Sequence, residues 1–301
     1  MVSVMLITYN RPHLVSRAIE SILKQTYRDF ELVIVGNGSG DDTNKILDEY
    51  AKKDERIRVI YRSRGSIGAG RNTAIDEAKG DCLTFIDDDD WVESDYLELL
   101  FSLMTENDAD LSICGTTIRH VEEKCVMTTE EALVELLRRK KYNVSYASKL
   151  FRKELWENIR CPEDAPLEDF AIMHKIVARA NRIAYYGLPK YTVYKHDGSQ
   201  SKWTVNHNLI DSKILENHLN GYRTRTEWLS ERFPNSAAKF RYFEWSFMIS
   251  MVEKVNRLEL QGCEKQLLYM TEELSSHSEE FLNSSEILDF EREWMKKYIM
   301  F

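Results

Sequence analysis

Short apolar runs alternate with amphipathic stretches over the first part of the chain. The apolar runs cover residues 2–7, 31–35, 57–61, 82–86 and 110–114. Between the first two runs, Leu14, Ala18 and Ile22 recur at the spacing of one helical face. Short runs rich in Val, Ile and Leu are typical of buried strands, and their alternation with helices predicts a mostly parallel sheet covered by helices. We therefore expect an α/β fold.

The pattern changes twice along the rest of the chain. Residues 116–205 are less regular, with helical stretches near 130–139 and 168–180 and strand-like stretches at 184–186 and 191–194. From residue 206 the chain is strongly helical, and one apolar stripe there is formed by Phe240, Phe243, Phe247, Met251 and Val255. A stripe of this kind is more often helix core than a sugar-binding surface. We expect three parts: 1–115 and 116–205 as two halves of one α/β domain, and 206–301 as a helical C-terminal subdomain.

Polar and glycine-rich residues follow three of the predicted strands. They are Thr8-Tyr9-Asn10, Gly36-Asn37-Gly38-Ser39 and Asp87-Asp88-Asp89-Asp90. In an open α/β sheet, ligands bind in the crevice outside the carboxyl ends of the strands. We therefore expect the three loops to converge on one site.

The overall charge argues against a nucleic acid as the main partner. The chain has 41 Lys and Arg against 50 Asp and Glu, a net charge of -9, which repels phosphate backbones. Its five cysteines are scattered and odd in number, as in a protein of the reducing cytosol. The apolar start of the chain resembles a first strand more than a signal peptide, and no transmembrane segment is expected. These features predict a cytoplasmic protein.

Four consecutive aspartates carry the clearest chemical signal. Asp87 to Asp90 directly follow an apolar strand, where like charges are costly unless a cation or a donor lies among them. A solvated acidic turn is the alternative interpretation. A hard cation such as Mg²⁺ or Mn²⁺ prefers carboxylate oxygen and takes one or two protein carboxylates, with phosphate and water completing its shell. The position of the run at the end of a strand therefore favours a site for a metal and a diphosphate.

Several motifs occur in an order that resembles glycosyltransferase family 2 enzymes of the GT-A fold. The motifs are Thr8-Tyr9-Asn10, Ser21-Ile22-Leu23-Lys24-Gln25-Thr26-Tyr27, Gly38-Ser39, Ala69-Gly70-Arg71-Asn72, Ala78-Lys79-Gly80, Phe85-Ile86 with the four aspartates and Trp91, Lys149-Leu150-Phe151, Glu168-Asp169 and residues 194–201. The resemblance implies a Rossmann-like domain and an inverting transferase. It also implies a nucleoside-diphosphate sugar as the donor, with a UDP-sugar as the first candidate.

The resemblance also implies a role for each candidate residue. The donor-binding set is Thr8, Tyr9, Asn37, Gly38, Arg71, Asp87, Asp88 and Asp89. Within this set, Tyr9 and the turn at 36–39 would hold the base, Arg71 would approach the base or the diphosphate, and Asp89 would contact the ribose. The metal, Mn²⁺ or Mg²⁺, would be bound by Asp90 and by His196, which is a loop histidine in the alternative interpretation.

Glu168 and Asp169 open a predicted helix. Carboxylates in a first helical turn are ordinarily explained by the helix dipole and by capping. The resemblance makes Asp169 the general base, with Glu168 in reserve. A carboxylate near the acceptor hydroxyl, opposite the leaving diphosphate, would remove the proton as the anomeric carbon is attacked, while the metal takes up the charge that develops on the leaving group. One such displacement inverts the anomeric centre.

The chain departs from the family at the second loop. The family commonly has two aspartates where this chain has Gly36-Asn37, and an amide at Asn37 adds hydrogen-bond donors and loses the charge. The nucleobase therefore stays open. A non-catalytic nucleotide-sugar-binding protein is the main alternative. A nucleotidyltransferase is disfavoured because the basic loop it needs after the first strand is absent, and the glycine clusters at 36–40 and 65–70 lack the spacing of a dinucleotide or phosphate loop.

The resemblance suggests partners but does not identify them. It implies a glycan or a lipid-linked glycan as the acceptor, in the synthesis of a bacterial surface polysaccharide. The apolar tail at 294–301 predicts a docked helix first and a peripheral contact with the inner face of the membrane second. Self-association as a homo-oligomer is left open, because the helical C-terminus suits either the acceptor side or a subunit contact.

Overall fold

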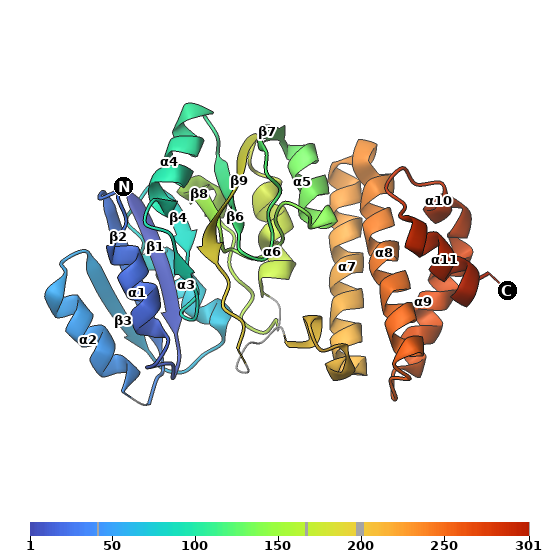
Figure 1. Cartoon of the computed structure of the whole chain (residues 1–301), viewed down its shortest axis with the longest axis horizontal. Coiled ribbons are helices and arrows are strands. Elements are labelled where there is room, and N and C mark those ends of the chain that lie inside the picture. Colours follow the sequence, from blue (N-terminus) through green and yellow to red (C-terminus); the bar gives the residue numbers. More distant parts are fainter. Residues whose placement is uncertain (41, 166–167, 197–201, 301) are drawn as a thin grey trace. The chain divides into compact units, whose positions relative to one another are not determined.

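The computed structural model describes residues 1–40, 42–165, 168–196 and 202–300. The chain divides into two compact units, Met1–Tyr194 and Lys195–Phe301, and each is described by itself (Figure 1). The first unit is an α/β domain and the second is helical.

The described part of the first unit forms one nine-stranded sheet. The strands are β1 (Val2–Thr8), β2 (Phe30–Asn37), β3 (Ile57–Arg62), β4 (Cys82–Phe85), β5 (Trp91–Val92), β6 (Leu111–Thr116), β7 (Lys124–Thr128), β8 (Lys149–Arg152) and β9 (Arg182–Thr192). Their order is β3-β2-β1-β4-β8-β6-β9-β5, and β7 also pairs with β9. The five strands expected from the apolar runs are thus confirmed as β1, β2, β3, β4 and β6.

The sheet is parallel in its first half and mixed in its second. β1 pairs in parallel with β2 on one side and with β4 on the other. β2 is buried along its whole length, which explains its nearly continuous apolar sequence. β8 runs antiparallel to both β4 and β6. The expectation of a mostly parallel sheet therefore holds for the first half only, because the four-residue strand β8 is too short to show a period in the sequence.

Helices cover this sheet (Figure 1). They are α1 (Val15–Leu23), α2 (Thr43–Lys53), α3 (Ile67–Glu77), α4 (Tyr96–Glu106), α5 (Thr129–Arg138), η1 (Lys153–Trp156) and α6 (Glu168–Val177). Apolar residues of α1, α2 and α4 share one core with β1 and β2, and α3 packs on the same two strands. Since β2, β1 and β4 are parallel neighbours, their carboxyl ends lie at one edge of the sheet. The three polar loops predicted to converge therefore do so.

The second unit consists of packed helices. They are α7 (Ser212–Arg232), α8 (Ala237–Arg257), α9 (Glu264–Ser276), α10 (Ser278–Leu282) and α11 (Asp289–Tyr298), with short turns η2 (Lys202–Thr204), η3 (His207–Leu209) and η4 (Pro234–Ser236). The stripe on α8 is core: Phe240 is fully buried, and Phe247 stacks on Tyr222 with ring centroids 4.2 Å apart.

The end of the chain packs as a helix. α11 lies on α8 and buries Met295, and Tyr242 of α8 donates a hydrogen bond of 2.8 Å to Glu291 of α11. This confirms the docked helix as the first interpretation of the tail. Among the helices in the described part of the chain, none has the length and apolar character needed to cross a bilayer.

Candidate functional site

The four aspartates form a turn at the end of β4, but they differ in exposure. The amide of Asp90 donates to the carbonyl of Asp87 at 3.1 Å, which closes the turn. The side chain of Asp87 is 40% exposed, whereas those of Asp88 and Asp89 are 8% and 15% exposed and Asp90 is buried. Asp87 therefore presents the most accessible carboxylate of the run.

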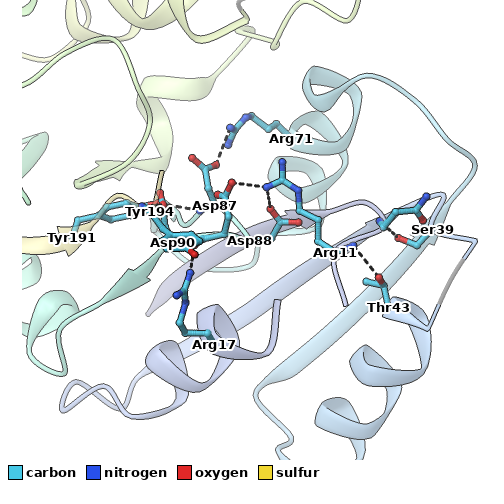
Figure 2. A network of polar contacts seen from close by, with 12 residues as sticks. Arg11, Arg17, Ser39, Thr43, Arg71, Asp87, Asp88, Asp90, Tyr191 and Tyr194 are labelled. Atoms are coloured by element: carbon cyan, nitrogen blue, oxygen red, sulfur yellow. Dashed lines mark hydrogen bonds and ion pairs between the residues drawn. The ribbon is translucent and has the colours of Figure 1, made fainter. Parts of the chain in front are cut away.

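Arg11, from the loop after β1, bridges two of the carboxylates (Figure 2). Its Nη1 atom donates to Oδ1 of Asp88 at 2.9 Å and to Oδ2 of Asp89 at 2.6 Å. Burial raises the pKa of Asp88 to about 6, and the Arg11 charge opposes that rise. Arg11 was not among the residues predicted from the sequence, although four adjacent carboxylates require counter-charge and an arginine stands in the neighbouring loop.

Residues at and just after the carboxyl end of β9 form hydrogen bonds with the aspartate turn. The amide of Tyr194 donates to Oδ1 of Asp90 at 2.8 Å, and the amide of Asp87 donates to the hydroxyl oxygen of Tyr191 at 3.1 Å. Burial raises the pKa of Asp90, and the charge of Asp87 raises it further. Asp90 is therefore held by the protein itself, in a position where a charge is costly without a cation.

Arg17 of α1 contacts both the aspartate turn and the end of β9 (Figure 2). Its Nη2 atom donates to the main-chain oxygen of Asp89 at 2.7 Å. Its guanidinium carbon lies 3.9 Å from the ring centroid of Trp91 and 4.3 Å from that of Tyr194. Contacts of a guanidinium with two aromatic faces are favourable, so Arg17 stabilises the turn against the end of β9. Arg17 was also not among the residues predicted from the sequence.

Arg71 of α3 links the aspartate turn to α6. Its Nη2 atom donates to Oδ1 of Asp87 at 3.2 Å and its Nε atom donates to Oε1 of Glu168 at 3.0 Å. Burial alone would lower the pKa of Arg71, but the charges of Asp87 and Glu168 outweigh burial and raise it. The guanidinium carbon also lies 4.7 Å from the ring centroid of Tyr146. The guanidinium therefore faces two carboxylates and an aromatic ring in a buried position.

Asp169 lies beside that ion pair, in the first turn of α6. Its Oδ1 atom accepts the amide hydrogen of Phe170 at 2.7 Å. Burial raises the pKa of Asp169 to about 6; the charge of Glu168 adds to the rise and the charge of Arg71 opposes it. The candidate base and its reserve are thus brought near the aspartate turn through Arg71. A carboxyl group with a pKa close to neutral suits proton removal at physiological pH.

The second loop packs in an unexpected way. Asn37 is buried, and its Nδ2 atom donates to the carbonyls of Gly65 and Ser66 at 3.0 and 3.2 Å. Its Oδ1 atom accepts from Arg62 at 3.2 Å. The amide thus braces the chain before α3, and both of its N–H groups have partners there.

Gly38 and the first loop complete this side of the site. Gly38 has a φ of 84°, and an added Cβ would lie 2.4 Å from the amide nitrogen of Arg64, so only glycine fits. The guanidinium carbon of Arg64 lies 4.6 Å from the ring centroid of Tyr9. Thr8 is buried at the end of β1. The structure therefore brings Thr8, Tyr9 and Gly38 to the same edge as the aspartates.

The aspartate turn can be tested for its fit to the predicted metal by the chemistry of its donors. In the described residues, no group of three or more His, Cys, Asp or Glu side chains converges on one point. The aspartate turn nevertheless offers carboxylate oxygens, and a hard cation needs one or two of these when a diphosphate supplies further ligands. The set therefore fits Mg²⁺ or Mn²⁺ bound together with a phosphate ligand. His196 belongs to the second unit, so its role stays a prediction.

Comparison with known proteins adds a family and relatives. The family model described as Glycosyl transferase family 2 matches residues 3–168. Glycosyltransferase GlyA of Streptococcus pneumoniae is 28% identical over 258 residues. That match covers 75% of this chain and 37% of GlyA, so the chain spans well under half the length of this relative.

Two solved structures are similar in fold. The S. aureus TarS 1–349 complex with UDP-GlcNAc has a TM-score of 0.62 and 19% identity, covering 96% of this chain and 94% of that one. The mannosyltransferase PcManGT from Pyrobaculum calidifontis, in complex with GDP-Man and Mn²⁺, has a TM-score of 0.61 and 16% identity, covering 99% and 84%. These similarities confirm the expected GT-A fold.

Proposed function

Because the chain belongs to glycosyl transferase family 2, we propose that it is an inverting enzyme that moves a sugar from a nucleoside-diphosphate donor to an acceptor hydroxyl. The observation that carries the proposal is the placement of Asp169 of α6 beside Arg71, which also holds Asp87 of the aspartate turn. A carboxylate for proton removal and a cluster suited to a metal and a diphosphate thus share one end of the sheet.

The donor would bind at the loops after β1, β2 and β4. Thr8, Tyr9, Asn37 and Gly38 would form the nucleoside side of the site, with Asp87, Asp88, Asp89 and Arg71 toward the ribose and the diphosphate. A UDP-sugar is the first candidate, supported by the UDP-GlcNAc complex of the similar TarS structure. The transferred group would be a hexosyl or N-acetylhexosaminyl group.

Mn²⁺ or Mg²⁺ would be held by oxygen atoms of the aspartate turn, with Asp90 as the proposed protein ligand. The bound cation would neutralise the charge that develops on the departing diphosphate. The raised pKa values of Asp88 and Asp90 support this, because both reflect carboxylates in a place that disfavours negative charge. The Mn²⁺ complex of the similar mannosyltransferase supports the choice of metal.

Asp169 would act as the general base. It would take the proton from the acceptor hydroxyl as that oxygen attacks the anomeric carbon, and Glu168, whose carboxylate pairs with Arg71, would be the reserve. Attack opposite to the leaving diphosphate inverts the anomeric centre. We propose a glycan or a lipid-linked glycan of a surface polysaccharide as the acceptor, reached in the cytoplasm or at the inner face of the membrane.

The departure of this chain from the family at Asn37 motivates a second candidate function. Both N–H groups of Asn37 bond within the protein, at a position where the family commonly has a charged aspartate. The alternative is a protein that binds a nucleotide-sugar and transfers nothing. The two differ in turnover, because only the enzyme releases a nucleoside diphosphate when donor, metal and acceptor are present.

The test is a thermal-shift screen of the purified chain, followed by a turnover assay. Nucleoside diphosphates and nucleotide-sugars are compared with and without Mn²⁺, since a ligand that binds only the folded state raises the unfolding temperature. Metal-dependent stabilisation by one nucleotide family, followed by transfer from that donor, supports the enzyme. Stabilisation without release of the diphosphate supports the binding protein, and no stabilisation by any nucleotide overturns both.

A further inference from the structure

Two consecutive residues of α3 hold the chain that leads into α6. Asn72 is buried and pairs with the main chain of Cys161 in both directions: its Nδ2 atom donates to the carbonyl at 2.9 Å, and its Oδ1 atom accepts from the amide at 2.8 Å. The same Nδ2 atom donates to Glu163 at 3.2 Å. Asn72 therefore makes the pair of hydrogen bonds that a neighbouring strand would make, because its side chain satisfies both main-chain groups of Cys161.

Arg71 holds the other end of that chain. Its buried guanidinium pairs with Glu168, one residue before the proposed base. The approach of the two segments is tight elsewhere too, since a Cβ added at Gly68 of α3 would lie 2.4 Å from the carbonyl oxygen of Pro162. Residues before α6 and the first residue of α6 are thus fixed to one helix at three points.

The same guanidinium reaches the donor side of the site. Arg71 pairs with Asp87, the most exposed carboxylate of the aspartate turn (Figure 2). A single side chain therefore contacts the proposed donor site at one end and the residue before the proposed base at the other. Any ligand that draws Asp87 away from Arg71 changes the charge that Glu168 and Asp169 experience.

We propose that Arg71 and Asn72 are positioning residues that align Asp169 and link its alignment to occupancy of the donor site. This inference rests on the proposed function, in which Asp169 is the base. Asn72 positions the chain before α6, whereas Arg71 both positions α6 and supplies a positive charge near Asp169. Replacing the two residues should therefore have different effects on activity.

The charge environment of Asp169 allows the two contributions to be separated. The titratable groups that face it come from several elements and are Glu168, Arg71, Asp87, Lys149, Tyr146 and Cys161. Removing the positive charge of Arg71 leaves Lys149 to oppose the carboxylates of Glu168 and Asp87, and this loss of positive charge favours the protonated form of Asp169. Replacing the neutral Asn72 leaves that balance unchanged.

The experiment compares Asn72→Ala, Arg71→Met and Arg71→Lys with Thr73→Ala as the control. Thr73 is on the same helix, and its hydroxyl donates within α3, to the carbonyl of Ala69. Asn72→Ala is expected to lower kcat about 10- to 100-fold with an unchanged donor KM and an unchanged pH profile. Arg71→Met is expected to lower kcat and also to move the acid limb of the profile to higher pH. Arg71→Lys should return the limb toward its original pH because it restores the charge.

A second readout needs no turnover. Cys161 is buried beside Asn72, whereas Cys125 of β7 is partly exposed and remote from α3 in the sheet, so thiol labelling followed by mass spectrometry gives a probe and an internal reference. In the unliganded protein, Asn72→Ala should label Cys161 about tenfold faster than Thr73→Ala, with Cys125 unchanged. UDP with Mn²⁺ should slow labelling of Cys161 in the wild type and not in Arg71→Met.

The outcomes separate this inference from the proposed function. If the wild type transfers sugar, the inference is overturned by an Asn72→Ala variant with normal kcat, or by an Arg71→Met variant with an unshifted pH limb. If the wild type neither binds nucleotides nor transfers sugar, the proposed function fails first. Equal labelling of Cys161 in Asn72→Ala and Thr73→Ala then overturns the positioning role on its own.

Discussion

The Nη1 atom of Arg11 lies 2.6 Å from Oδ2 of Asp89 while it also donates to Asp88. One nitrogen thus donates hydrogen bonds to oxygen atoms of two carboxylates and places a positive charge between them. Arg11 would therefore compete electrostatically with a cation held at Asp90 of the same turn. This competition predicts that the protein without nucleotide binds divalent cations more weakly than its four carboxylates would otherwise allow.

Replacing Arg11 by Gln should strengthen Mn²⁺ binding. The substitution removes a positive charge that contacts two carboxylates of the turn. An affinity gain of about 5-fold or more is expected, because two unit charges about 4 Å apart interact by about 1 kcal/mol even in bulk water. Electron paramagnetic resonance of free Mn²⁺ in a titration measures it. Arg56→Gln, which breaks an ion pair with Asp54, is the control. Equal or weaker Mn²⁺ binding by the Arg11 variant would show that no competition exists.

Replacing Asp169 by Asn should abolish most transfer and leave donor binding intact. Loss of a general base costs about 10²- to 10⁴-fold in rate. Asp164→Asn is the matched control, because Asp164 is exposed and precedes α6 by a few residues. Turnover and the donor dissociation constant are measured for both variants. A large change in donor affinity in Asp169→Asn would assign the residue to donor binding instead.

The activity of the wild type should fall as the pH is lowered through about 6. Burial raises the pKa of Asp169 to about 6. A base must be deprotonated to accept a proton, so activity is present above that pH and lost below it. A profile of kcat/KM between pH 5 and 8 measures the limb. A limb near the ordinary pKa of an aspartate, about 4, would contradict this placement of the base.

Replacing Asn37 by Asp should destabilise the protein, although aspartate is common in the family at this position. The carboxylate oxygens would face the carbonyls of Gly65 and Ser66, which now accept from the amide. A loss of about 1–3 kcal/mol in unfolding free energy is expected for these unsatisfied groups. Urea denaturation measures it. Asn37→Ala removes the donors without adding a charge, so it should lose less, and the reverse order would refute the explanation.

Glu31 should contribute stability that depends on pH. Burial alone would raise its pKa, but hydrogen bonds from the Ser3 hydroxyl, the Lys79 amide and Arg58 outweigh burial and lower it. A lowered pKa in the folded state gives stability that is present above the pKa of the unfolded chain and is lost as the pH falls through the folded pKa.

Glu31→Gln should therefore lower the unfolding free energy by about 2 kcal/mol at pH 7, as expected for hydrogen bonds to a charged group. The difference from the wild type should shrink as the pH falls below the ordinary glutamate pKa. Urea denaturation at pH 7 and at pH 4 measures it. Glu77→Gln is the control, since Glu77 pairs with the same Arg58 at the surface. A difference that grows toward pH 4 would exclude this account.

The sequence was sufficient to predict the first half of the sheet and the convergence of its polar loops. β1, β2 and β4 have long apolar runs followed by polar loops, and parallel pairing brings those loops together without further information. Asp169 was identified through the family resemblance rather than through any local pattern. Its raised pKa depends on burial, which a linear sequence does not show.

The parts that were missed depend on long-range contacts. Arg17 faces solvent or site according to how α1 docks on the sheet, and its partners Trp91 and Tyr194 come from distant segments. The role of Asn37 was open for the same reason, because its partners lie 28 and 29 residues away. Strand β8 has four residues, too few for a period to be recognised.

The hydrogen bond from the amide of Tyr194 to Asp90 can form only late in the synthesis of the chain. The two residues are 104 positions apart, and β9 pairs with β6 within the sheet. At a synthesis rate of about 5–20 residues per second, Tyr194 is added about 5–20 s after Asp90. A nascent chain that ends at residue 168, the limit of the family match, would leave β6 without its β9 neighbour. Such an unpaired strand is open to wrong pairing, so chaperones that shield strand edges should matter most during this interval.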